Sequence, residues 1–155
     1  MPIIRKRIIT DINVIEDIIR KTKVIFVGMS VNDQPYVLPF NFGYKDRTFY
    51  IHGDPVGKKI DFLKTNNKVC ISLEIDSELY VRHETMACSY SMTYTSVVAN
   101  GTAEFITDFD EKVEALNHVM HQYTNKEFSF GKPSVDSVAV IRIKCEEIIA
   151  HIRGV

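Results

Sequence analysis

HGDPVGKKID, residues 52–61, follows an apolar strand-like run and opens a short helical pattern. Lys58 and Lys59 fall in the first turn of this helix, where the partial positive charge of the N-terminus disfavours cations. An anion bound beside the free backbone N–H groups would explain both lysines, and a phosphate is the usual candidate. The alternative is a solvated lysine pair on a surface helix. Gly53 and Gly57, which let backbone approach a ligand, favour the anion site.

The run that precedes this stretch, residues 36–44, alternates as a strand does. Its larger side chains share one face and most of the smaller ones share the other: Tyr36, Leu38, Phe40, Phe42 and Tyr44 against Val37, Pro39, Asn41 and Gly43. Because Pro39 has no N–H to donate, we expect an edge strand or an interruption there. An interrupted strand would leave backbone groups free for a flat heterocycle, whereas an ordinary edge strand explains the proline equally well.

The rest of the chain reads mostly as strands, with helices inserted between them. Apolar periodicity predicts helices over residues 11–21, 56–65 and 109–123, and strands over 24–31, 36–44, 48–52, 68–75, 96–105 and 137–145. Residues 76–85 are expected to form a loop with a short strand, and residues 125–136 a loop. Because most strands follow one another without a crossover helix, the pattern predicts a mainly β (α+β) fold, an antiparallel barrel of about six strands with peripheral helices.

Composition excludes several classes of protein. A chain of 155 residues predicts a single domain. Its 19 basic and 20 acidic side chains give no indication of nucleic-acid or membrane binding. No apolar run approaches the roughly 18 residues of a membrane span, and residues 1–10 lack a signal-peptide core, so a cytoplasmic location is expected. Three cysteines without a C-x-x-C pattern indicate no zinc site, and His118 with His121 lacks a third ligand, so no metal is predicted.

The pattern resembles the FMN-binding split barrels, the superfamily of pyridoxamine 5′-phosphate oxidase, and within it the nitroimidazole-resistance branch. Four segments carry the resemblance: Pro35–Tyr44 (PYVLPFNFGY), Phe49–Leu63 (FYIHGDPVGKKIDFL), Tyr90–Phe105 (YSMTYTSVVANGTAEF) and His121–Thr124 (HQYT). The resemblance implies a six-stranded antiparallel split β-barrel over residues 1–155 and a homodimer with flavin sites at its interface. It implies FMN as cofactor, with FAD as the alternative and NAD(P)H as a candidate electron donor.

The resemblance also assigns cofactor-binding residues. The strand at 37–41 would line the isoalloxazine ring, largely through its backbone, with Val37, Leu38, Pro39, Phe40 and Asn41. His52 and Gly53 would pack at the flavin. Lys58 and Lys59 would hold its phosphate, although the family often has arginine at the first of these positions. Ser96 would reach the flavin from the second subunit.

His52 is the candidate catalytic residue, because the nitroimidazole-resistance branch has an active-site histidine at this position. A neutral imidazole can relay a proton near physiological pH, or it can shape the pocket through hydrogen bonds alone. The expected function is a flavin-dependent oxidoreductase acting on a small molecule, with nitro compounds as candidate substrates. A non-catalytic flavin storage or sensing protein is one alternative. A pyridoxamine phosphate oxidase is another, which His151 and Arg153 leave open.

Overall fold

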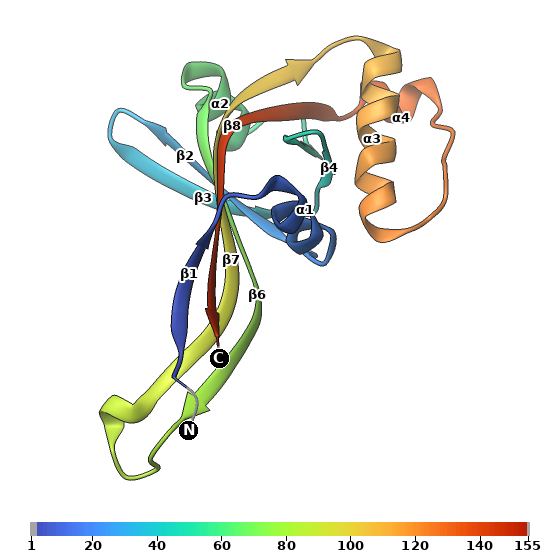
Figure 1. The fold of residues 1–155 in the computed structure, drawn as a ribbon. Helices are drawn as coiled ribbons and strands as arrows, with labels where there is room; N and C mark the ends of the chain where they lie inside the picture. Colours follow the sequence, from blue (N-terminus) through green and yellow to red (C-terminus); the bar gives the residue numbers. More distant parts are fainter. Residues whose placement is uncertain (1–2, 155) are drawn as a thin grey trace.

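The computed structural model describes residues 3–154 and contains one antiparallel sheet of eight strands. The strands run in the order β3-β2-β6-β7-β8-β5-β4, and β1 pairs with β8 outside this path (Figure 1). Their bounds are β1 (Arg5–Ile9), β2 (Ile25–Val31), β3 (Gln34–Phe40), β4 (Gly43–Lys45), β5 (Thr48–Gly53), β6 (Lys68–Val81), β7 (Tyr90–Ile106) and β8 (Ala139–Gly154). The mainly β, α+β fold class is therefore confirmed.

Four α-helices and a 3-10 turn accompany the sheet: α1 (Ile12–Arg20), α2 (Lys58–Thr65), η1 (Ala87–Ser89), α3 (Phe109–Tyr123) and α4 (Lys132–Asp136). Asp11 caps α1 by accepting from the Asn13 N–H, and Asp108 caps α3 by accepting from the Glu111 N–H. The short α4 lies where a loop was expected, because five residues are too few to show a helical period. No helix within residues 3–154 is long and apolar enough to cross a membrane.

The predicted number of six strands is wrong for two physical reasons. The first strand, β1, has almost no buried side chain and so shows no period-two pattern. The predicted strand at 36–44 is two strands, because the chain leaves the ladder at Asn41 and Phe42. There the N–H of the buried Phe42 donates to the Tyr123 Oη of α3 at 3.1 Å instead of to a strand.

The interior of the barrel follows from alternation along the strands. Ile25, Val27 and Met29 of β2 point inward and are buried, while Phe26 points outward. Phe42 and Phe49 are the largest fully buried side chains, and helix α1 contributes Ile15 and Ile19 to the same core. The other large, fully buried side chains of this core include Ile51, Ile60, Leu63, Ile71, Leu73, Ile141 and Ile143. This core fixes the positions of β3, β5 and α2, the three elements of the candidate site.

Strands β6 and β7 continue beyond the barrel as a long hairpin arm, which runs away from the helices in Figure 1. The register shifts between Ile75 and Glu78, with Asp76 at a φ of 58°, and β6 then resumes to Val81. The loop expected over residues 76–85 is therefore mostly strand. Both faces of this arm are largely exposed, so its sequence lacks the alternation that marks a half-buried strand.

Candidate functional site

The junction between β5 and α2 is built by glycine. Gly57 precedes the first helical residue with a φ of 124°, a conformation that side chains with a β-carbon rarely adopt. Its carbonyl accepts from the N–H groups of Ile60 and Asp61, both at 3.1 Å. The N–H groups of Lys58 and Lys59 precede these first helical bonds, and such groups at a helix N-terminus can bind an anion.

Both lysines fold toward the aromatic side chains of β3. The Lys58 Nζ lies 4.3 Å from the centre of the Tyr36 ring, and the Lys59 Nζ lies 5.9 Å from that of Phe40. Gly53 makes room for this arrangement, because a β-carbon at that position would lie 2.5 Å from the Lys59 Nζ. The structure thus brings the predicted residues Phe40, Gly53, Lys58 and Lys59 to one place.

Strand β3 is an edge strand that pairs only with β2. The expected edge at Pro39 is therefore found, while the break in the ladder comes two residues later. Leu38 and Phe40 are half-buried and pack against the core, whereas Val37, Pro39 and Asn41 are exposed, Val37 at 58%. An edge strand directs part of its backbone N–H and C=O groups away from the sheet, so this strand offers free polar groups to a flat ligand.

His52 lies in β5 opposite Val140 of β8 and is half-buried. Burial lowers the pKa of its imidazole, and the positive charge of Lys59 lowers this pKa further. The ring is therefore neutral at neutral pH. Among the described residues its nitrogens have no hydrogen-bond partner, so both are available to a ligand.

Ser96 lies apart from these residues within one chain. It pairs with Glu74 of β6 and His151 of β8, and β3 is separated from β7 by β2 and β6. That Ser96 contacts the flavin of a second subunit, as the family resemblance implies, stays a prediction.

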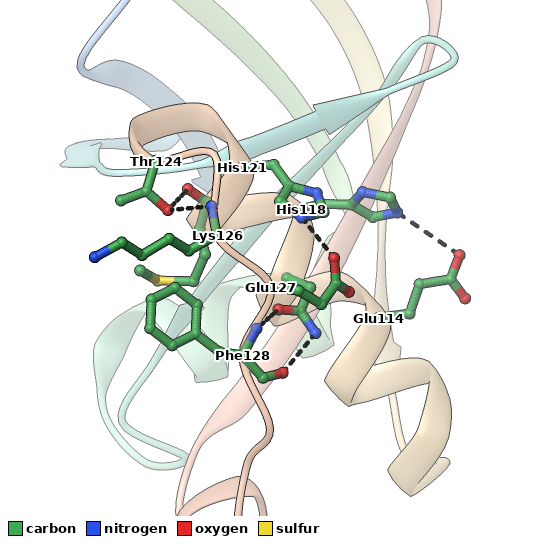
Figure 2. Close-up of polar contacts among 9 residues, drawn as sticks. Glu114, His118, His121, Thr124, Lys126, Glu127 and Phe128 are labelled. Atoms are coloured by element: carbon green, nitrogen blue, oxygen red, sulfur yellow. Dashed lines mark hydrogen bonds and ion pairs between the residues drawn. The ribbon is translucent and has the colours of Figure 1, made fainter.

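The histidines of α3 serve the structure of the helix and the following loop. The His118 Nε2 lies 3.7 Å from a Glu114 carboxylate oxygen, and the His121 Nε2 lies 2.9 Å from Glu127 (Figure 2). The His118 ring also lies against Tyr50, with ring centres 4.8 Å apart. Within residues 3–154 no three potential ligands gather as a metal site would need.

Two tyrosines contact the candidate site without having been predicted there. Tyr36 faces Lys58, as described above, and Tyr123 holds the break after β3 by accepting from the Phe42 N–H. Tyr36 belongs to the alternating run 36–44, and Tyr123 belongs to the HQYT segment. Neither pattern indicates which distant residue each one meets.

Comparison with known proteins agrees with this architecture. A family model described as pyridoxamine 5′-phosphate oxidase matches residues 11–152, nearly the whole chain. This chain belongs to the pyridoxamine 5′-phosphate oxidase family. The family resemblance that the sequence carries is thereby confirmed. No curated protein matches the chain.

Solved structures of other members of this fold are similar over most of the chain. A candidate 5-nitroimidazole antibiotic resistance protein from Bacteroides thetaiotaomicron shares 36% identity over 99% of this chain and 90% of its own, with a TM-score of 0.85. A flavocytochrome from Azotobacter vinelandii has 22% identity over 96% and 70% of the two chains, with a TM-score of 0.83. An FAD and heme binding protein from Mycobacterium smegmatis has 15% identity over 96% and 74%, with a TM-score of 0.85. At these lower identities the likeness to the last two proteins concerns the fold.

Proposed function

We propose that this protein binds FMN at the junction of β3, β5 and α2 and acts as a flavin-dependent oxidoreductase on small molecules, with nitro compounds as candidate acceptors. The observation that carries the proposal is the placement of the Lys58 and Lys59 ammonium groups between the first turn of α2 and the aromatic rings of β3. Two cations beside free helix N–H groups match a phosphate in charge and in hydrogen bonding.

The residues present fit a flavin mononucleotide. Lys58 and Lys59 would hold the phosphate, and the space above Gly53, which a β-carbon would fill, keeps the Lys59 ammonium free to reach it. The exposed edge from Val37 to Asn41 would support the ring system. When bound, the flavin supplies the electron or hydride transfer, while the protein supplies position and charge.

His52 would hold or accept a proton at the edge of the site. Its lowered pKa keeps the imidazole neutral, which is the form that can accept a proton. Within residues 3–154 its two ring nitrogens have no hydrogen-bond partner, which is consistent with a contact to a ligand instead of to another side chain. The competing role, in which His52 only shapes the pocket, predicts that its replacement by glutamine leaves turnover intact.

The names of two relatives support a flavin. One is a flavocytochrome and another an FAD and heme binding protein, while the 36% identical relative is a candidate nitroimidazole resistance protein. FAD is the alternative cofactor, and NAD(P)H is the proposed electron donor. A flavin carrier without turnover is the alternative function.

A homodimer belongs to the same proposal, because the family resemblance assigns Ser96 to the flavin site of the second subunit and β7, which carries Ser96, is separated from β3 by two strands. Exposed apolar side chains on the outer face of the sheet, among them Phe26 and Val37, offer a surface for a second copy.

The first test is an absorbance spectrum of the purified protein, followed by chromatography of the cofactor that heat releases. We expect the visible bands of an oxidised flavin and release of FMN. A colourless protein that takes up neither FMN nor FAD would refute the proposal. Anaerobic reduction by NAD(P)H, followed by addition of a panel of nitro compounds, then separates an enzyme from a carrier, because only an enzyme is reoxidised with turnover of the acceptor.

A further inference from the structure

The Lys58 side chain lies over two aromatic rings at the start of α2. Its Nζ is 4.3 Å from the centre of the Tyr36 ring and 5.4 Å from that of the Phe62 ring. An ammonium within about 6 Å of a ring centre is attracted to the electron-rich face of the ring. Tyr36 and Phe62, here called the aromatic pair, therefore attract the same positive charge from two sides.

The core beneath the aromatic pair fixes the two rings. Their centres are 5.3 Å apart, and the ring planes are inclined by 60°. Both side chains are half-buried and pack against the core. Tyr36 pairs with the buried Met29 of β2, and Phe62 precedes the buried Leu63 of α2. The rings therefore offer fixed faces to the ammonium.

Two different elements supply the aromatic pair, and a hydrogen bond ties these elements together. Phe62 follows Lys58 by four residues, so the two side chains are neighbours on the surface of α2. Tyr36 comes from β3, which pairs along its length with β2. At the end of α2 the Asn66 Nδ2 donates to the Ser30 carbonyl of β2 at 2.9 Å. The place of Lys58 over Tyr36 is thereby set by the packing of α2 beside β2 and β3.

The carboxylates that are close to Lys58 in sequence do not pair with it. Within residues 3–154, neither Asp54 nor Asp61 forms an ion pair or a side-chain hydrogen bond with Lys58. Lys58 is an exposed residue, so its ammonium remains accessible to a ligand. Because an ammonium carries three N–H donors, it can lie over the rings and donate to an anion at the same time.

The aromatic pair changes what Lys58 loses when it binds an anion. A freely moving lysine gives up side-chain entropy on binding, whereas an ammonium that the rings already hold has less to lose. Removal of a ring should then weaken binding of the anion. The opposite role, in which the rings hold the ammonium away from the anion, predicts tighter binding once a ring is removed. The direction of the effect distinguishes the two roles.

We propose that Tyr36 and Phe62 are positioning residues, which hold the Lys58 ammonium ready for the phosphate of the flavin. The inference takes its ligand from the proposed function and adds to it the residues that set the affinity for the phosphate group. Lys59 depends less on such contacts, because its Nζ lies 5.9 Å from the centre of the Phe40 ring, near the limit of the attraction.

The first test is a fluorescence titration of the flavin-free protein with FMN and with riboflavin, which lacks the phosphate. Tyr36→Leu should raise the Kd for FMN about three- to ten-fold and leave the Kd for riboflavin unchanged. Tyr36→Phe keeps the ring and should bind FMN within about two-fold of wild type. The matched control is Phe105→Leu, which removes a ring 5.9 Å from the Lys64 Nζ near the other end of α2 and should leave both Kd values unchanged.

A double-mutant cycle separates the positioning of Lys58 from a general effect on the fold. In the Lys58→Ala background, Tyr36→Leu should not change the Kd for FMN further, because no ammonium remains to be held. Phe62→Leu should behave as Tyr36→Leu does in both backgrounds. A loss of FMN affinity that is equally large with and without Lys58, or that is matched by a loss of riboflavin affinity, would overturn the inference.

The flavin-free protein gives a second measurement that does not depend on a ligand. Two rings at 4.3 and 5.4 Å should shift the Hε protons of Lys58 upfield in NMR spectra of protein with 13C-labelled lysine, assigned by their loss in Lys58→Arg. The upfield shift should shrink in Tyr36→Leu and persist in Phe105→Leu. Lys58 protons at the position of a solvated lysine in wild type would contradict the inference.

The titrations distinguish this inference from the proposed function. A wild-type protein that takes up no FMN would refute the proposed function, and the inference with it. Uptake of FMN by wild type, with a Kd that Tyr36→Leu leaves unchanged or lowers, would refute the inference alone.

Discussion

Lys59 is the residue at which charge, helix geometry and strand packing meet. Replacing it with alanine should weaken FMN binding at least about ten-fold, because a charge-assisted contact to phosphate is worth about 1.5–3 kcal/mol. Quenching of flavin fluorescence during titration of the protein measures the Kd. Lys64→Ala, which removes a lysine from the other end of the same helix, is the matched control. Equal affinities of Lys59→Ala and wild type would rule out the phosphate assignment.

His52 makes stability depend on pH in a defined direction. Its pKa is lowered from 6.5 by burial and then by Lys59, so the folded chain resists protonation more than the unfolded chain does. This contribution to stability is complete above pH 6.5 and is lost as the pH falls toward the lower pKa of the folded state. Burial lowers the pKa of His118 in the same direction, so part of the effect remains without His52.

The Tm should therefore fall on acidification from about pH 7 to about pH 5, and fall less in His52→Gln than in wild type. Differential scanning calorimetry across this range makes the measurement. His83→Gln removes a histidine from the exposed arm and is the control. A steeper fall in His52→Gln than in wild type would show that the sign is wrong.

At this scale, the sequence is informative where the reason for a residue is local. Two lysines in the first turn of a helix and a glycine directly before it are recognisable from the sequence. Helix α2 does begin at Lys58, directly after Gly57. The contact between Lys58 and Tyr36 is not local, because it depends on how α2 packs beside an edge strand. No spacing within either segment encodes it.

Among the elements, strand β4 and helix α3 pack so closely that no side chain fits between them. A β-carbon on Gly43 would overlap the backbone of His118 and Val119, which cannot move without displacing the helix. Gly43→Ala should therefore destabilise the protein by about 1–3 kcal/mol, as overpacking usually does. Urea denaturation followed by circular dichroism gives the difference.

Gly131→Ala is the control for this substitution. A β-carbon added at Gly131 would lie 3.9 Å from its nearest neighbour, the Pro133 Cδ, and the φ of Gly131 is −69°. The free energy of unfolding should therefore change by no more than about 0.5 kcal/mol. Comparable losses in both variants would show that the contact between β4 and α3 does not matter to the stability of the fold.

Helices and strands that bury one face could be predicted from the spacing of their apolar residues. Helix α3 and strand β2 have strong periodic patterns and were found close to their bounds. Strand β1 and the outer part of β6 are exposed on both faces, and helix α4 is a single turn, so hydrophobic pattern cannot identify them.

For the whole molecule, the family resemblance predicts a flavin site shared between two subunits, with Lys59 from one and Ser96 from the other. Mixed dimers of Lys59→Ala and Ser96→Arg should recover FMN binding, because each mixed dimer contains one site in which neither partner is altered. Random pairing makes about a quarter of all sites intact. Fluorescence titration after mixing and subunit exchange counts those sites.

A mixture of Lys58→Ala with Lys59→Ala is the control for this experiment, since both lysines belong to the same half of the site and no pairing restores it. Recovery in the control as large as in the test mixture would disprove the shared site, and so would the absence of recovery in both.

Strand β8 pairs with β1, β5 and β7, and it follows all of them in the described chain. None of these three ladders can form until β8 has left the ribosome. Until then the nascent chain exposes the unpaired edges of these partner strands, a state prone to aggregation. Closure of the barrel, and with it the protection of these edges, therefore depends on the strand of the sheet that is made last.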